Sequence, residues 1–230
     1  MASQMPQVAT RPTSQPSLRQ NVYDLLKSDI LRCRLPPNSD LREQSLAERF
    51  VVSKSPVRDA LLRLEQERLV TVMPRQGYRV APISIEDARE TFGLRKVLEA
   101  ACVEAATAAA PDEILAGLNV FRGSQGVESK IGNDFFIAYN RAFHSAVCIA
   151  SGNKRMARVA IDLIEQMERM VRYSVDALEA SAIVLIEEHG RIIDAIQQRD
   201  RRTASRLMKE HISQAERRVI NSLSRSAIHV

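Results

Sequence analysis

The sequence predicts a mainly α-helical protein in two parts: a small N-terminal unit that ends in a β-hairpin, then an antiparallel bundle of about six helices. Two closely spaced amphipathic helices, followed by two short β-branched runs, predict the first part. After residue 82 every periodic segment has helical spacing and none alternates like a strand. Charge divides at the same place, because residues 1–82 carry 13 Lys/Arg and 8 Asp/Glu while the remaining residues carry 20 of each.

The helical pair lies within Glu43 to Arg68, and its second helix has the layout of a recognition helix. The apolar face of that helix repeats at i, i+3, i+4 and i+7, with the residues Val57, Ala60, Leu61 and Leu64. Ser53 stands at the N-cap position. The first turns present Lys54, Ser55 and Arg58, which a helix in a major groove can place on phosphates and base edges. The alternative is a generic helical hairpin with a basic exposed face.

Two β-branched runs, Leu69 to Val72 and Tyr78 to Val80, flank the segment Pro74-Arg75-Gln76-Gly77. Gly77 supplies the permissive backbone that a tight hairpin needs, so we expect a wing with Arg75 at its tip. A preceding helix at Arg19 to Cys33 completes a winged helix-turn-helix. After that helix, Asn38 stands at a turn where a left-handed backbone is expected.

Four motifs in this part carry a family resemblance. They are Leu46-Ala47-Glu48, Val52 to Leu61 (VSKSPVRDAL), Leu69-Val70 and Pro74 to Gly77. The segment resembles the GntR family of bacterial transcription regulators, and the resemblance implies that Lys54 and Arg58 contact DNA while Gln76-Gly77 approaches the minor groove. Lys54 replaces the family's usual arginine, so it offers a point charge without a bidentate fork. The residues predicted to bind DNA are Gln44, Ser53, Lys54, Ser55, Arg58, Arg75, Gln76 and Gly77.

Composition limits the class of protein further. Cys33, Cys102 and Cys148 are far apart with no CxxC pair, which is typical of reduced thiols in a cytosol. No apolar run approaches the roughly 20 residues needed to span a bilayer, so we expect a cytoplasmic protein without a membrane partner. We expect a flexible tail at 1–18, a winged helix domain at 19–82 and a helical domain at 83–225.

The helical domain begins near Ser84, which opens its first helix like a capping box. The expected helices are Ile85 to Ala110, Asp112 to Phe121, Asp134 to Ala150, Asn153 to Ala177, Ala180 to Gln198, and Asp200 to about Ser224. Its motifs are Arg95-x-x-Leu98-Glu99, Asn140-x-x-Phe143-His144, Ser151-Gly152-Asn153, Glu188-His189 and His211. With these residues the bundle resembles the FCD effector domain of the FadR subgroup of GntR regulators.

Three of the four histidines, His144, His189 and His211, lie on the apolar stripes of three different helices. Burying an imidazole without a partner costs a few kcal/mol, so a shared reason is expected. Asn140 lies one turn before His144 and adds an amide oxygen to the same face. Three nitrogens and an oxygen suit a divalent transition metal. The alternative is that each histidine is satisfied by a separate hydrogen bond.

The FCD resemblance implies that the domain binds Zn²⁺, Ni²⁺ or a similar ion through an Asp and three His, but here Asn140 stands at the Asp position. Loss of that carboxylate weakens the site electrostatically but leaves more positive charge on the ion for an anionic ligand, so either the metal affinity falls or the bound ligand matters more. Arg95 is the candidate for binding an effector carboxylate, since a guanidinium can hold one bidentately. The alternative is an Arg95–Glu99 ion pair on a solvated helix face.

We therefore predict a sequence-specific transcription regulator, acting as a repressor, that binds a palindromic double-stranded DNA operator as a homodimer. A small organic acid, bound at or near the metal, is expected to modulate operator binding. No enzymatic activity is expected. The alternatives are a constitutive dimeric DNA-binding protein without an effector and a zinc-dependent hydrolase with Glu187 or Glu188 as its base.

Overall fold

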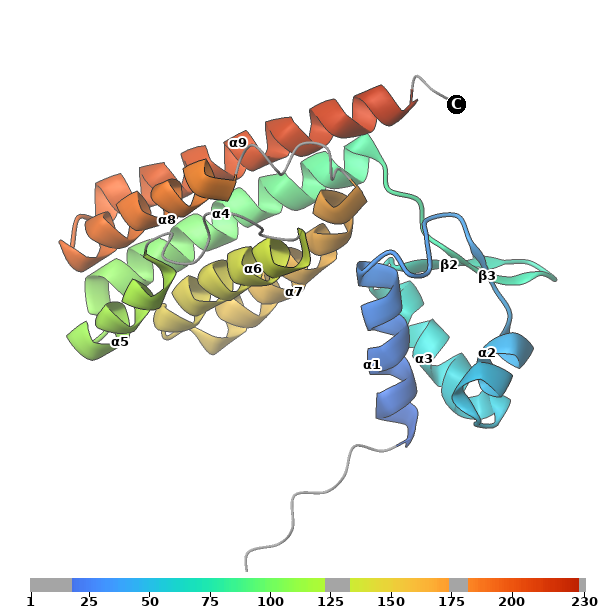
Figure 1. The fold of residues 1–230 in the computed structure, drawn as a ribbon. Coiled ribbons are helices and arrows are strands. Elements are labelled where there is room, and N and C mark those ends of the chain that lie inside the picture. Colours follow the sequence, from blue (N-terminus) through green and yellow to red (C-terminus); the bar gives the residue numbers. More distant parts are fainter. Residues whose placement is uncertain (1–17, 123–132, 174–181, 228–230) are drawn as a thin grey trace, which may run out of the picture. The chain divides into compact units, whose positions relative to one another are not determined.

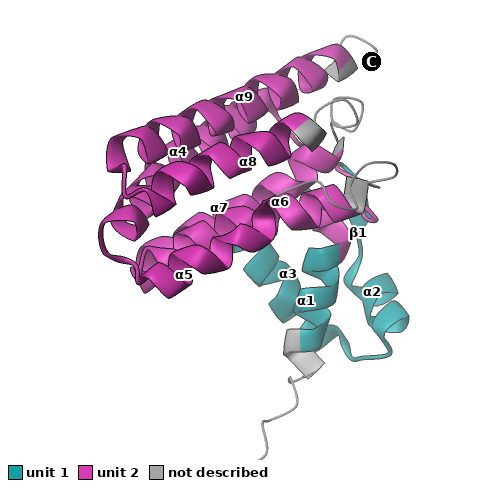
Figure 2. Cartoon of the chain, turned by 60° about the vertical axis from the view of Figure 1, so that its left-hand side comes forward, with its two compact units in different colours: residues 1–28, 38–81 teal, residues 29–37, 82–230 magenta. Residues whose placement is uncertain are grey.

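The computed structural model describes residues 18–122, 133–173 and 182–227. The chain divides into two compact units, one of residues 1–28 and 38–81 and the other of residues 29–37 and 82–230 (Figure 2). Each unit has its own buried core. The predicted tail lies outside the described residues except for Leu18, where the first helix begins.

Unit 1 contains a helix-turn-helix and a small sheet. Its elements are α1 (Leu18–Leu31, whose last residues from Asp29 on are grouped with the other unit), β1 (Asp40–Leu41), α2 (Glu43–Phe50), α3 (Lys54–Gln66), β2 (Val70–Met73) and β3 (Gly77–Val80). The four apolar residues predicted for the second helix are all buried on α3. The turn between α2 and α3 is closed by Val51, which has a left-handed backbone with φ 54°. Asn38 is also left-handed, with φ 67°, as the sequence predicts.

The sheet is antiparallel with the strand order β1-β3-β2. The hairpin of β2 and β3 is confirmed, with Met73 opposite Gly77 at its closed end. The sequence did not predict β1, because two residues are too few to show alternation. Gly77 is needed for two reasons. Its backbone has a φ of +109°, and a Cβ added there would lie 2.8 Å from the Leu41 carbonyl oxygen of β1.

Unit 2 is a bundle of antiparallel helices. Its elements are α4 (Ile85–Ala109), α5 (Asp112–Gly117), the 3-10 helix η1 (Leu118–Phe121), α6 (Asn133–Ala150), α7 (Lys154–Tyr173), α8 (Ala182–Gln197) and α9 (Arg201–Ala227). The two longest helices, α4 and α9, lie side by side (Figure 1). The helix expected at 112–121 changes to a 3-10 helix after Gly117. The predicted boundaries at Ala177 and Ala180 lie outside the described residues.

Local signals set several helix starts in unit 2. The Ser84 side chain accepts a hydrogen bond from the Asp87 amide at 2.9 Å, which caps α4 as predicted. Asn153 Oδ1 accepts from the Met156 amide at 3.1 Å and caps α7. These caps orient the helices that carry the polar residues of the interior.

Cys102 and Cys148 are buried free thiols, while Cys33 is only partly buried. None of the helices in the described ranges is both long and apolar enough to cross a bilayer.

Candidate functional site

Three imidazole rings meet inside unit 2. His144 on α6, His189 on α8 and His211 on α9 are at most 3% exposed. The Nε2 atom of His211 lies 3.2 Å from Nε2 of His144 and 3.3 Å from Nε2 of His189. The three rings therefore face the interior, as their places on apolar helix stripes predict, and they present nitrogen atoms to a common point.

Two carboxylates set the orientation of two of these rings, those of His144 and His211. Glu99 Oε2 on α4 lies 2.5 Å from Nδ1 of His144, and Glu188 Oε2 lies 2.6 Å from Nδ1 of His211. A carboxylate accepts a hydrogen bond, so it favours the tautomer that carries its proton on Nδ1. In this tautomer the Nε2 atoms of His144 and His211 each carry a lone pair and no proton, and these two atoms face each other. The Phe143 ring stacks on His189 with 3.8 Å between centroids.

Two of the rings, those of His144 and His189, favour the neutral form. Burial lowers the pKa of His144 to about 4, although the nearby Glu99 acts in the opposite direction. Burial, together with the other two histidines, holds the pKa of His189 well below its usual value. Burial alone would raise the pKa of Glu99, but Arg95 and His144 outweigh it and lower the pKa to about 2. A neutral imidazole with its outer nitrogen hydrogen-bonded to a carboxylate is the usual form of a metal-binding histidine.

The donor set fits a divalent transition metal. One nitrogen from each of the three histidines lies within 4.8 Å of the others. Adjacent lone pairs without a proton between them repel, and a cation removes that repulsion. Asn140 lines the cavity beside His144 and His211, so the structure brings it to the site. Its amide offers a neutral oxygen where a carboxylate would add a charge.

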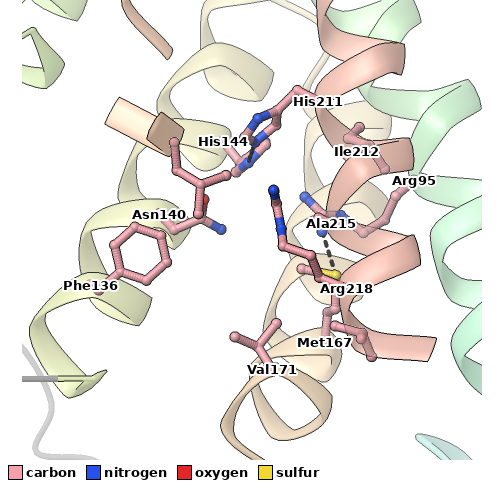
Figure 3. Close-up of a pocket in the computed structure, with 12 residues that line it drawn as sticks. Arg95, Phe136, Asn140, His144, Met167, Val171, His211, Ile212, Ala215 and Arg218 are labelled. Atoms are coloured by element: carbon pink, nitrogen blue, oxygen red, sulfur yellow. Dashed lines mark hydrogen bonds between the residues drawn. The ribbon is translucent and has the colours of Figure 1, made fainter. Parts of the chain in front are cut away.

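A cavity opens directly beside His144 and His211 (Figure 3). It encloses about 520 Å³ of empty space, counted to its mouth. Its lining residues are Arg95, Phe136, Asn140, His144, Met167, Val171, Leu185, His211, Ile212, Ala215, Arg218 and Val219.

Arg95 combines the two alternatives that the sequence left open. Its Nε lies 2.6 Å from Glu99 Oε1, so the i,i+4 ion pair exists. The expectation that this pair lies on a solvated face is wrong, because the side chains are 1% and 0% exposed. The guanidinium also lines the cavity, and its Nη2 is buried without a hydrogen-bond partner among the described residues. Arg95 thus keeps a donor for a ligand while Glu99 balances its charge.

Three residues of the site were not assigned these roles by sequence reasoning. Glu99 and Glu188 orient histidines on other helices, and Arg218 adds a second guanidinium to the cavity wall. A signal for Arg218 was present, because it follows His211 by seven residues and so lies on the same face of α9. The two glutamates belong to the motifs, but the histidines that they contact lie on other helices.

In unit 1 the predicted recognition helix presents its first turn to solvent. Lys54, Ser55 and Arg58 are exposed on α3. Arg58 donates two hydrogen bonds to the Glu43 carboxylate at 3.0 and 2.8 Å, which lowers the pKa of Glu43. This pair, missed in the sequence because its members lie on different helices, fixes the direction of the guanidinium. Ser53 is the N-cap residue, but its side chain makes no capping hydrogen bond.

The remaining predicted DNA-binding residues lie on α2 and the wing. Gln44 is exposed near the start of α2, and its amide donates to Glu48 at 2.5 Å. Arg75 and Gln76 are exposed at the tip of the hairpin, where Arg75 has a left-handed backbone with φ 63°. These positions place polar side chains at the ends of two elements of unit 1.

A winged helix-turn-helix is a DNA-binding architecture, and here it is followed by a helical unit with an internal cavity. Residues 18–80 match the model for bacterial regulatory proteins of the gntR family, and residues 90–214 match the FCD domain. The chain therefore belongs to the GntR family and carries an FCD domain, in agreement with the resemblance to the FadR subgroup.

Individual relatives agree with this membership. The transcriptional repressor GlaR of Escherichia coli (strain K12) is 31% identical over 202 residues, which cover 83% of this chain and 90% of GlaR. The repressor RspR of the same organism is 27% identical and covers 86% of each chain. A putative GntR regulator from Rhodococcus sp. RHA1 has the same fold, with a TM-score of 0.73 and 22% identity over 89% of this chain and 98% of that one.

The matched domains and relatives are transcription regulators rather than enzymes. This confirms the expectation of a non-enzymatic protein and removes the support for a zinc-dependent hydrolase. Glu188, the base considered for that alternative, is hydrogen-bonded to His211.

Proposed function

We propose that this regulator is a cytoplasmic repressor that binds a palindromic operator as a homodimer and is controlled by a small organic acid. The observation that carries the proposal is the cationic cavity of unit 2 beside three converging imidazoles. Such a cavity joins a space open to a ligand with groups that attract a carboxylate.

The DNA contacts are assigned to α3, α2 and the wing. Lys54 and Arg58 supply positive charge at the exposed start of α3, where a helix can enter the major groove. Gln44, Ser53 and Ser55 add polar groups nearby, and Arg75, Gln76 and Gly77 form the wing tip that lies against the minor groove. The excess of Lys and Arg in residues 1–82 supports this assignment.

The metal would be held by His144, His189 and His211, with Asn140 as a neutral fourth donor. Zn²⁺ and Ni²⁺ both accept imidazole nitrogen. When bound, the ion would supply positive charge for an anionic ligand. Arg95 would hold the ligand's carboxylate through the Nη2 donor that it keeps free of Glu99.

The homodimer is assigned to unit 2, where α4 exposes two apolar side chains one turn apart. Leu94 is 46% and Val97 is 64% exposed. Val97→Lys would place a charge in that contact and is expected to yield monomers in sedimentation velocity. Val120→Lys, at a side chain that is 77% exposed on η1, is the matched control. A dimer that survives Val97→Lys would contradict this assignment.

The test of DNA binding uses fluorescence anisotropy on a duplex selected from a random pool. Lys54→Ala with Arg58→Ala is expected to weaken binding at least about 100-fold, from the loss of two charged contacts. Arg202→Ala with Lys209→Ala removes the same charge from exposed positions of α9 and should leave binding unchanged. Equal binding by the first pair and the wild type would overturn the recognition-helix assignment.

The test of control by a ligand repeats the titration with carboxylic acids, alongside elemental analysis of protein purified without a histidine tag. A bound effector raises the melting temperature and changes operator affinity. If no acid does either, the protein is a constitutive DNA-binding dimer.

A further inference from the structure

The cavity of unit 2 holds two guanidinium groups from different helices. Arg95 comes from α4, and Arg218 comes from α9, two turns after His211. Figure 3 shows both side chains extending into the cavity from its walls. An effector in this space therefore meets two separate cationic groups in addition to the histidines.

The two arginines differ in how their charges are balanced. Arg95 has Glu99 as a buried ion-pair partner. Arg218 makes no hydrogen bond or ion pair with any residue in the described part of the chain, and its Nη2 atom is buried. The acidic group that acts on it is Glu188, whose carboxylate is already bonded to His211, while Arg217 acts in the opposite sense. Within the described part of the chain, Arg218 is thus a cation without an anion of its own.

The described lining residues of the cavity supply no anion for Arg218. No acidic side chain is among its described lining residues, and Asn140 contributes an amide at the position where a carboxylate would neutralise one charge. Arg218 is partly buried and its Nη2 atom has no partner, which is costly for a charged group, so a ligand that brings more than one negative charge is favoured. The other walls are apolar, with Phe136 and Val171 on one side and Val219 on α9. These side chains suit a short carbon skeleton.

We infer that the effector is a small organic dianion and that Arg218 recognises its second negative charge. This inference rests on the proposed function, because it names the class of acid that the same cavity takes. The dianion is either a short dicarboxylate or a small phosphate monoester, and both would meet the same two guanidinium groups. A monocarboxylate of equal length would leave Arg218 unpaired.

The predicted selectivity follows from one charge-assisted interaction. A hydrogen bond to a charged group contributes enough to change a dissociation constant by about 10- to 100-fold. Glutarate should therefore bind the wild-type protein that much more tightly than valerate, which has the same number of carbons and one carboxylate. Arg218→Gln should lose this preference while its affinity for valerate changes little.

Isothermal titration of the full chain with glutarate, valerate and glycerol 3-phosphate tests the inference. Arg217→Gln is the matched control, because it removes the same charge from the exposed neighbouring position on α9 and should keep the preference. Preference for glycerol 3-phosphate over glutarate would identify a phosphate monoester, and the reverse a dicarboxylate. Should Arg218→Gln fail to fold, the wild-type affinities of glutarate and glycerol 3-phosphate relative to valerate still decide.

Two outcomes separate failure of this inference from failure of the proposed function. If valerate binds the wild type as tightly as glutarate and glycerol 3-phosphate do, or if Arg218→Gln keeps the preference for the dianion, the inference is overturned and control by an organic acid stands. If neither the monoanion nor either dianion binds the wild type, control by a small acid fails and the inference fails with it.

Discussion

Glu99 Oε2 lies 2.5 Å from Nδ1 of His144 in the interior of the helical unit, where the side chains are 0% and 1% exposed. The other carboxylate oxygen of Glu99 is bound to Arg95 at 2.6 Å. One glutamate on α4 thus links a cation of the cavity wall to a histidine of the triad. Its charge supports both the packing of the unit and the direction of the imidazole.

Glu99→Gln is expected to weaken metal binding by about 10- to 100-fold, because the outer hydrogen bond of a metal-binding histidine raises its basicity and fixes its ring. Stability should also fall by about 3–5 kcal/mol, since Arg95 loses its buried partner. Competition with a chelator measures the first effect and urea unfolding the second. Glu188→Gln alters the corresponding contact with His211 without removing the partner of a buried arginine, so it should weaken metal binding with a smaller loss of stability. Unchanged affinity in both variants would exclude the proposed orienting role.

The metal-free protein is expected to lose stability in acid, in two ranges. The folded-state pKa of His144 is lowered from 6.5 to about 4, so the unfolded chain binds a proton first and stability falls as pH drops from 6.5 toward 4. The pKa of Glu99 is lowered from 4.5 to about 2, so its contribution is complete above pH 4.5 and is lost toward pH 2. Urea midpoints after EDTA treatment, followed by circular dichroism because the chain has no Trp, measure this trend. In His144→Gln the slope between pH 6.5 and 5 should be shallower, and an equal slope would assign the effect to other groups.

The triad could be predicted because each histidine lies within the apolar stripe of a single helix, where 3.6-residue periodicity fixes which side chains face inward. The residues that form hydrogen bonds with these histidines could not be predicted. Glu99 and His144 are separated by 45 positions, and which helix faces which is decided by packing of the whole bundle. The same reason hid the contact between Glu43 and Arg58. Local patterns thus predict the direction of a side chain but not the group that it meets.

A similar reason explains which parts of the fold could be predicted from the sequence. The hairpin of β2 and β3 could be predicted from its β-branched runs and from Gly77, while β1 consists of Asp40 and Leu41 and pairs only with β3. A two-residue strand carries no periodic signal, so its place depends on the rest of the sheet. The 3-10 segment after Gly117 was likewise not predicted, because its composition continues that of a helix.

Glu43→Gln is expected to reduce the selectivity of unit 1 for its operator by about tenfold. The carboxylate holds Arg58 through two hydrogen bonds, and a guanidinium that is not held in one direction discriminates bases less well. Removing a negative charge from this face should at the same time strengthen non-specific binding, with a steeper dependence on salt. The ratio of dissociation constants for the selected duplex and a scrambled one measures the change. Glu65→Gln, on an exposed side chain near the end of α3, changes the charge equally without releasing Arg58 and should keep the ratio. A loss of selectivity in both variants would mean that charge alone, rather than the contact with Arg58, is responsible.

Gly77→Ala should destabilise the wing by about 1–3 kcal/mol, because φ at this position is +109° and an alanine there is strained. The new Cβ would also lie 2.8 Å from the Leu41 carbonyl oxygen, which belongs to the backbone of β1 and can move only if the strand moves. The amide of Val80, which donates to the Ser39 carbonyl at 2.9 Å beside β1, should therefore exchange its hydrogen faster with deuterium. Gly93→Ala is the control, since a Cβ there meets nothing within 4 Å and alanine favours the interior of α4 by up to about 1 kcal/mol. Slow exchange at Val80 in Gly77→Ala would mean that β1 is not held against the hairpin as the strand register requires.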